Sequence, residues 1–264
     1  MAGETQKDAP IRSNPMLATL APKPGRYPLL PDLTPQQELA LLCRALHREG
    51  YDEHINGHVT LAQPDGSFLV NPWELTWDEL TADDIIRVDE KGTIIEGAWN
   101  VTPAIGLHLE VNKRRHDLKV ALHNHSQWGL VWSASGRVPP VYDQTSGQVA
   151  GELVFYDEYA GTVDGASEAV AVADALGDHK WALLKNHGVF VVAKDIRQAH
   201  LRAITLEHRC RLAWQVETLG KGHPITNFET LKMAQMSDDL GFPFLWEAMA
   251  RKEIRLDGRV LGDI

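Results

Sequence analysis

The amino-acid sequence predicts an α/β layered domain, in which helices cover a central sheet. Short β-type runs predominate in the middle of the chain, and stretches with helical apolar spacing flank them. The 264 residues suffice for one large domain with a sizeable core, but two ordinary domains would need a longer chain. With 44% hydrophobic and 23% charged residues, the composition is that of a soluble globular protein.

The chain is expected to begin with a flexible tail over residues 1–30, or with an arm that lies on a neighbouring molecule. Prolines recur there among small and charged residues, a composition that resists a packed core. A helix follows over residues 33–50. Thr34 is its candidate N-cap, Pro35 lies in its first turn, and Gly50 ends the apolar pattern.

Two β-hairpins are expected next. The runs 58–62 and 67–70 are separated by the turn sequence Pro-Asp-Gly. Residues 84–97 repeat this pattern, with Lys91 and Gly92 at the turn.

The following segments alternate between helix and strand. Residues 102–115 read as a helix, and residues 118–126 read as a strand buried on both faces. After a longer irregular region, residues 179–195 give two apolar β runs about an Asn-His-Gly turn. A long helix then runs from Asp195, its N-cap, to Gly220.

The predicted domain therefore covers residues 31–225, and residues 226–264 form a helical extension. Helical apolar spacing recurs in this extension in two short pieces, which Gly241 and Pro243 divide. The extension is expected to cap a pocket or to pack on a neighbour.

Charge and composition exclude several classes of partner. The formal net charge is -10, and the longest basic run is Lys113 to Arg115, so nucleic acid and anionic membranes are not expected partners. No run of apolar residues is long enough to span a membrane, and no signal peptide opens the chain. We therefore expect a cytoplasmic protein with a small-molecule substrate. Cys43 and Cys210 are expected to be buried thiols.

Three histidines stand at the ends of apolar runs. His123 and His125 are two residues apart in a predicted strand, so their side chains point to the same face. His187 precedes Gly188, which permits a tight turn that presents an imidazole at a strand end. The His-x-His pair alone also fits hydrogen-bonded polar residues at a strand end. Three neutral imidazoles together would form an open-sided site for one zinc, manganese or iron(II) ion.

The segments LHLEVNKRRHDLKVALHNHS and LLKNHGVFVVAKDIRQAHLRAITLEHRCRLA resemble the class II aldolase and adducin head-domain family, over about residues 34–225. That family includes aldolases and epimerases that act on fuculose, rhamnulose and ribulose phosphates. The resemblance implies that the three histidines bind one divalent metal per subunit, usually zinc, as a Lewis acid. It also implies a three-layer α/β/α fold with a mostly antiparallel sheet, and a homotetramer with sites at subunit boundaries.

This chain departs from the family where the aldol base is expected. In the aldolases, a glutamate on the helix before the His-x-His strand serves as the general base. An ungapped alignment back from His123 places Ala104 there, and a methyl group cannot accept a proton. The resemblance is therefore to a divergent member that lacks the usual base.

The phosphate-binding segments of the family are altered as well. Trp73 adds a flat apolar face, Glu74 would repel a dianion, and Pro103 after Thr102 removes an amide donor. Trp73, Glu74 and Thr102 are therefore predicted to bind a substrate without phosphate, aromatic or otherwise apolar. The alternative for Trp73, and for Trp77, is simple packing against the core.

Another group must then supply acid–base chemistry. His58 stands where the family's phosphate loop approaches the substrate, and Tyr142 and Asp143 lie in a loop that is near the active site in relatives. Each of the three is predicted as catalytic, with a structural role as the alternative. His108 is expected to pack or to form a helix–sheet hydrogen bond.

Three functions fit these patterns. The first is a metal-dependent lyase that cleaves a carbon–carbon bond, by retro-aldol reaction or decarboxylation, in a non-phosphorylated hydroxy-carbonyl or hydroxyaromatic acid. Decarboxylation fits the missing glutamate best, because it needs an electron sink and a proton donor rather than a strong base. The second is a mononuclear iron(II) oxygenase acting on a hydroxyaromatic acid. The third is a non-catalytic, adducin-like binding module.

Overall fold

The computed structural model describes residues 29–149, 153–159, 161, 165–227, 229, 231, 232, 238 and 242–263. The chain divides into two units, Met1–Asp32 and Leu33–Ile264, and the elements below all belong to the second. The predicted N-terminal tail, apart from its last two residues, lies outside the described residues. No helix in the described ranges is long and apolar enough to cross a membrane.

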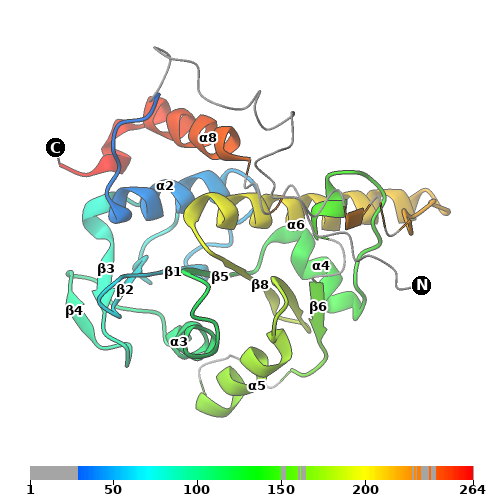
Figure 1. The fold of residues 1–264 in the computed structure, drawn as a ribbon, viewed down its shortest axis with the longest axis horizontal. Coiled ribbons are helices and arrows are strands. Elements are labelled where there is room, and N and C mark those ends of the chain that lie inside the picture. The colour runs from blue at the N-terminus through cyan, green and yellow to red at the C-terminus, as the bar shows by residue number, and fades with distance from the viewer. Residues whose placement is uncertain are drawn as a thin grey trace, which may run out of the picture. The chain divides into compact units, whose positions relative to one another are not determined.

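Within the described residues, eight strands form one sheet in the order β4-β3-β2-β1-β5-β8-β7-β6 (Figure 1). Every neighbouring pair is antiparallel except β6 and β7, which are parallel. The sheet is therefore mostly antiparallel, as the family resemblance implied. The strands are β1 His58–Ala62, β2 Phe68–Val70, β3 Ile86–Val88, β4 Ile94–Glu96, β5 Val120–Asn124, β6 Leu153–Tyr156, β7 Trp181–Leu184 and β8 Gly188–Ala193.

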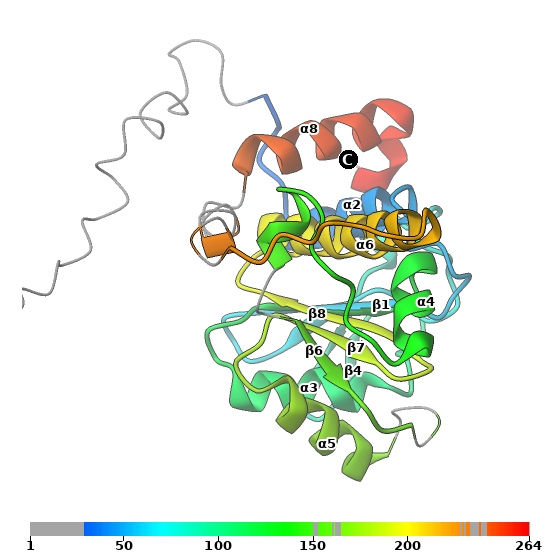
Figure 2. The ribbon, with the colours of Figure 1, turned by 90° about the vertical axis from the view of Figure 1, so that its right-hand side faces the viewer.

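Helices cover both faces of this sheet (Figure 2). Helices α3 and α5 lie on one face, α2, α4 and α6 lie on the other, and α8 packs on the outer side of α2. The predicted three-layer α/β/α architecture is confirmed. The helices are α2 Pro35–His47, α3 Ile105–Arg114, α4 Gln127–Ser135, α5 Ala166–Leu176, α6 Ile196–Thr218 and α8 Pro243–Leu256, with short 3-10 turns at η2 Ala82–Asp84, η3 Ser146–Val149 and η4 Gly258–Leu261.

Local sequence signals place the ends of several elements. Helix α2 begins with a capping box, in which Thr34 Oγ1 accepts from the Gln37 amide at 3.2 Å and Gln37 Oε1 accepts from the Thr34 amide at 3.0 Å. Asp195 caps α6 by accepting from the Gln198 amide at 2.8 Å. Both predicted N-caps are confirmed, and so are both hairpins, since β1 pairs with β2 and β3 with β4.

Helix α3 starts later than the sequence predicted. Residues 102–104 form a turn, in which the Ile105 amide donates to the Thr102 carbonyl at 3.2 Å, and the helix begins only at Ile105. Thr102 and Ala104 therefore lie just before the N-terminus of the helix and not inside it.

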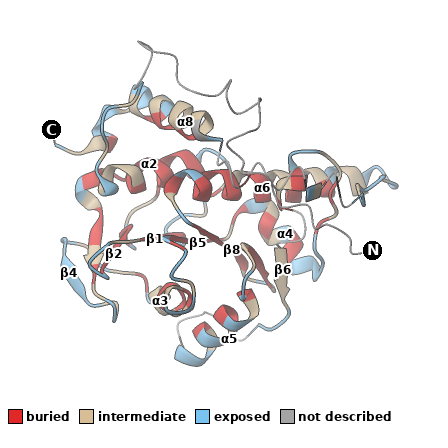
Figure 3. Cartoon of the chain, viewed as in Figure 1, coloured by how far each residue is buried: buried red, intermediate tan, exposed pale blue. Residues whose placement is uncertain are grey.

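The core lies on the central strands of the sheet and the helices that cover them. All five residues of β5 are buried, as the sequence predicted, and burial is concentrated on the central strands and on α2 and α6 (Figure 3). Ala121 packs into the cluster beneath α3 and α5, so His123, two residues on, points to that same face. Cys43 and Cys210 are free and buried, as expected.

The prediction of an irregular region between residues 126 and 179 is wrong. The structure places α4, β6 and α5 there. Helix α4 contains no charged residue, and α5 is rich in alanine, so neither shows the alternation of large apolar and charged side chains by which a surface helix is recognised.

A distant carboxylate caps α4. Glu207, on α6, accepts from the Trp128 amide at 2.8 Å and from the Gly129 amide at 3.0 Å. Its side chain is 5% exposed, so these two amides have a buried, charged acceptor. Helix α4 therefore depends on a tertiary contact for its first turn.

The C-terminal region is fastened to the same unit by ion pairs. Glu253 of α8 pairs with Arg48 at 2.8 Å, and Asp257 pairs with Arg44 at 2.9 Å. Most of the residues predicted as the first piece of the extension lie outside the described ranges. The division of the chain at residue 225 stays a prediction.

Replacement of Glu207 by alanine is expected to lower the free energy of unfolding by about 3 kcal/mol, because two buried amides lose a charged acceptor. Glu217→Ala on the same helix is the matched control. It removes only a surface ion pair with Arg137, so about 1 kcal/mol or less should be lost. Urea unfolding followed by circular dichroism measures both, and equal losses would contradict the capping role.

Candidate metal centre

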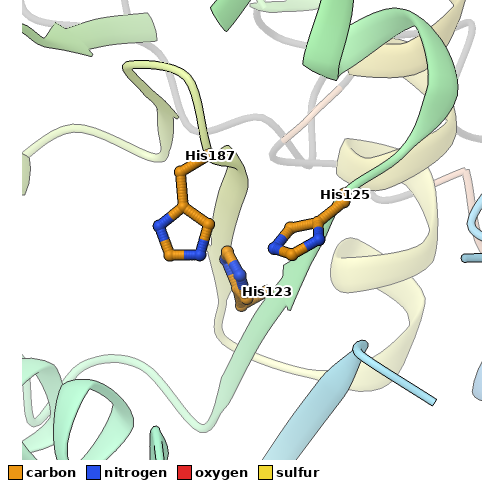
Figure 4. Close-up of side chains that lie close together, drawn as sticks. All are labelled: His123, His125 and His187. Carbon is orange, nitrogen blue, oxygen red and sulfur yellow. The ribbon is translucent and has the colours of Figure 1, made fainter. Parts of the chain in front are cut away.

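Three histidines converge where the end of β5 meets the start of β8 (Figure 4). His123 is the fourth residue of β5, His125 follows that strand, and His187 lies in the turn between β7 and β8. The potential ligand atoms of the three imidazoles all lie within 4.8 Å of one another. The structure thus brings together the three residues predicted as metal ligands.

The turn that carries His187 depends on backbone conformations that few residues allow. Asn186 has a φ of 52°, in the left-handed region that asparagine tolerates better than most residues. At Gly188, a β-carbon would lie 2.6 Å from the Asn124 carbonyl oxygen and 2.8 Å from His125 Cδ2. Only glycine lets β8 approach β5 this closely, and this approach brings His187 beside His125.

A hydrogen bond at His123 and an ion pair at His125 indicate which nitrogen of each ring faces the centre. His123 Nδ1 lies 2.9 Å from the Val189 carbonyl oxygen and must donate to it, which leaves Nε2 as a lone-pair donor. The Glu53 carboxylate pairs with His125 Nδ1, and His125 Nε2 is buried with no hydrogen-bond partner among the described residues. A divalent cation would satisfy that orphaned nitrogen, so the donor set fits a metal ion.

Burial favours the neutral, metal-binding form of His123 and His187. Burial, with the neighbouring histidines, lowers the pKa of His123 well below its usual value. The pKa of His187 falls to about 4 for the same reasons, burial first and then His125. A neutral imidazole offers a lone pair to a cation without repelling it.

A cavity of about 190 Å³ opens beside the triad. Its lining combines imidazoles with apolar side chains. No carboxylate is among the residues that line it in the described part of the chain. The lining residues are Asn56, His58, Trp73, Thr102, Pro103, Ala104, Leu107, His123, His125 and His187.

Of the predicted catalytic residues, His58 lies in this cavity. It stands directly opposite His123 in the pairing of β1 with β5, and the two ring centroids are 4.9 Å apart. His58 Nδ1 lies 2.6 Å from His108 Nε2, the helix–sheet hydrogen bond expected for His108.

Two of the three predicted substrate-binding residues line the cavity, and the third does not. Trp73, 41% exposed, and Thr102 line the cavity, whereas Trp77 is 1% exposed and packs in the core. Glu74 is not among the lining residues of the described protomer, and its carboxylate accepts from the Asn100 amide at 3.1 Å. Ala104, the position expected for the family base, does line the cavity.

Tyr142 and Asp143 are not among the residues that line the cavity in the described part of the protomer. Asp143 accepts from the Ser146 amide at 3.0 Å and lies 3.1 Å from His208 Nε2, and the Tyr142 ring lies against Gly222. A catalytic role for these two residues stays a prediction.

Glu53 is the contact that sequence reasoning missed. It precedes β1, and β1 pairs antiparallel with β5, so the residues before His58 lie beside the residues after His123. The acidic residues just before β1 were the available signal in the sequence. They indicate a histidine partner only when the pairing of β1 with β5 is known.

A comparison with protein families identifies the family of this chain. Residues 37–214 match the family model described as the class II aldolase and adducin N-terminal domain. The chain belongs to the class II aldolase and adducin family. Class II aldolases use a divalent metal, and the histidine triad of this family member can hold one.

Relatives of this class II aldolase-family protein include enzymes with diverse names. A 4-hydroxy-3-prenylphenylpyruvate oxygenase/4-hydroxy-3-prenylbenzoate synthase from Streptomyces roseochromogenus subsp. oscitans is 28% identical over 191 residues, which cover 70% of this chain and 69% of the relative. A 3,4-dihydroxyphthalate decarboxylase from Arthrobacter keyseri is 27% identical over 231 residues, 83% of this chain and 92% of the relative.

Among solved structures, an L-fuculose 1-phosphate aldolase from Glaciozyma antarctica PI12 has a TM-score of 0.77 with 24% identity. The match covers 86% of this chain and 91% of the aldolase. This likeness supports the class II aldolase fold.

Replacement of His187 by alanine is expected to abolish the metal content, because two imidazoles with one orphaned nitrogen make a weak site. His187 lies in a turn, so the fold should survive. Elemental analysis of the purified protein measures the outcome, with the exposed His116→Ala as control. A full metal complement in the His187 variant would show that the three histidines do not form the metal site.

Replacement of Glu53 by glutamine is expected to weaken metal affinity by about 10- to 100-fold, because an outer carboxylate orients its histidine and raises its basicity. The neighbouring Asp52 is exposed, so Asp52→Asn is the matched control and should leave affinity unchanged. Competition with a fluorescent chelator measures both variants. An unchanged Glu53→Gln affinity would show that His125 is oriented by the backbone alone.

Proposed function

We propose that this protein is a divalent-metal-dependent lyase that cleaves a carbon–carbon bond in a non-phosphorylated hydroxyaromatic or hydroxy-carbonyl acid. The supporting observation is the triad of imidazoles beside a cavity that apolar side chains also line, with no carboxylate among its described lining residues. Decarboxylation suits this cavity better than retro-aldol cleavage, because it needs a proton donor rather than a strong base.

The lyase class follows from family membership together with decarboxylase and aldolase relatives. The substrate class has separate support. The names of two relatives refer to hydroxyaromatic acids, a prenylated hydroxyphenylpyruvate and a dihydroxyphthalate. An aromatic acid would also match the wall formed by Trp73 and Leu107.

A metal held by His123, His125 and His187 would act as a Lewis acid on substrate oxygens and take up the charge that develops as the bond breaks. Trp73 would stack on an aromatic ring, and the apolar lining residues Pro103, Ala104 and Leu107 would help to exclude water. His58, across from His123, supplies a proton to the carbon that loses the carboxylate.

The finer features of the proposal are zinc as the metal, a homotetramer and a cytoplasmic location. Zinc suits three imidazoles with an open position, although manganese or iron(II) would fit the same donors. Family members are commonly oligomeric and act on small molecules. Sites at subunit boundaries would give Tyr142, Asp143 and Glu74 a route to a neighbour's cavity.

A second candidate is an iron(II) oxygenase, which the name of the Streptomyces relative favours. Three neutral imidazoles with open positions suit iron and dioxygen as well as zinc. A non-catalytic, adducin-like role is disfavoured, because all three ligands are present and converge.

Anaerobic incubation of the zinc-loaded protein with a panel of hydroxyaromatic acids tests the proposal. We expect carbon dioxide release, with one decarboxylated product formed per molecule released. The same acids without the hydroxyl group, and the His187→Ala protein, are the controls and should show none. Turnover that requires iron and consumes oxygen would favour the oxygenase, and cleavage of sugar phosphates at a comparable rate would exclude the proposed substrate class.

A further inference from the structure

A row of three polar side chains leads away from the cavity into the interface between β1 and α3. His58 Nδ1 lies 2.6 Å from His108 Nε2, and His108 Nδ1 lies 2.9 Å from Thr60 Oγ1. His58 and Thr60 are two residues apart on β1 and so share a face, and His108 bridges them from α3. His108 uses both of its ring nitrogens in this row. His58 uses Nδ1, so its Nε2 is left for other contacts.

This row lies in surroundings that disfavour a net charge. His58, Thr60 and His108 are 5%, 2% and 1% exposed. The edge of the Phe190 ring covers His108, with ring centroids 5.4 Å apart, and no carboxylate is hydrogen-bonded to either ring among the described residues. An imidazolium here would be buried without a counter-ion, so both rings are held neutral.

Two neutral rings joined in this way cannot choose their tautomers independently. Each hydrogen bond holds one hydrogen, so the row has two self-consistent arrangements. In one, Thr60 donates to His108 Nδ1, His108 Nε2–H donates to His58 Nδ1, and His58 carries hydrogen on Nε2. In the other, His58 Nδ1–H donates to His108 Nε2, His108 Nδ1–H donates to Thr60, and His58 Nε2 is bare.

The far end of the row meets a small recess. Its volume is about 10 Å³, close to the room that one water molecule needs, and Thr60 and His108 line it. Asn112 and the exposed Lys119 line the same recess, so it lies near the protein surface. The row therefore extends from the cavity beside the triad to a second point of contact with solvent.

We propose that Thr60, His108 and His58 form a proton relay, through which His58 Nε2 exchanges protons with solvent while both rings stay neutral. When His58 Nε2 accepts a proton, its Nδ1 hydrogen moves to His108 Nε2, and the His108 Nδ1 hydrogen moves to Thr60 Oγ1. The original hydroxyl hydrogen of Thr60 passes to water in the recess. One proton enters and one leaves, and delivery to a substrate carbon is the reverse sequence.

Within this relay Thr60 and His108 are positioning residues, because they act on the cavity only through His58. The use of the relay in turnover rests on the proposed lyase function, but the coupling of the two tautomers does not. The coupling can therefore be measured in the absence of any substrate.

The test replaces Thr60 by valine, which keeps the shape and β-branching but removes the hydroxyl. Nitrogen-15 spectra of the histidine-labelled, zinc-loaded full chain report the tautomer of each ring. In the wild type, we expect His58 and His108 to be neutral and to carry hydrogen on the same-named nitrogen. In Thr60→Val both rings should change their tautomer populations together, since valine can neither donate to His108 Nδ1 nor accept from it, and Thr60→Ser should restore the wild-type spectrum.

Opposite tautomers on the two rings, a protonated ring at neutral pH, or no response to Thr60→Val would each overturn the relay. With a turned-over substrate, Thr60→Val should lower kcat at least tenfold with KM and metal content unchanged, and Thr60→Ser should rescue it. Coupled tautomers in a protein that decarboxylates nothing would refute the lyase and keep the relay. Normal turnover in Thr60→Val would refute the relay and keep the lyase.

Discussion

The pairing of β5 with its two neighbours is the constraint on which the rest of the site depends. On one side, antiparallel pairing with β1 sets His58 opposite His123. On the other side, the pairing with β8 ends at Val189, and the neighbouring Gly188, which has no side chain, lets the β7–β8 turn approach His125. Because β5 is buried on both faces, this register cannot slip by one residue without turning its polar side chains into the opposite layer.

Much of the fold could be predicted from the sequence because its signals are local. The N-caps Thr34 and Asp195 are recognised by residue type and spacing alone, and the hairpins by their turn residues. The His-x-His spacing on a strand dictates a common face, so two of the three ligands were predictable in geometry as well as in identity. The third, His187, was predicted from its place after an apolar run and before Gly188. The resemblance to a family supported it, and the family match bore out that resemblance.

The remaining features depend on contacts between distant residues. Helix α4 carries no charge pattern of its own, and its first amides are satisfied by Glu207 from α6. Likewise, the residues around Glu53 in the sequence do not indicate a histidine partner. Glu74 was predicted to bind substrate, but its carboxylate accepts a hydrogen bond from the Asn100 amide. Side chains that take their roles from tertiary pairing are the part that local sequence patterns cannot supply.

His123 and His125 are held by unlike means, and this has an evolutionary consequence. His123 is anchored by the Val189 carbonyl, a backbone group that no substitution removes without disturbing the sheet. His125 is anchored by Glu53, a side chain in the segment between α2 and β1. Mutations in that connecting segment could therefore change how tightly the ion is held while leaving the scaffold intact.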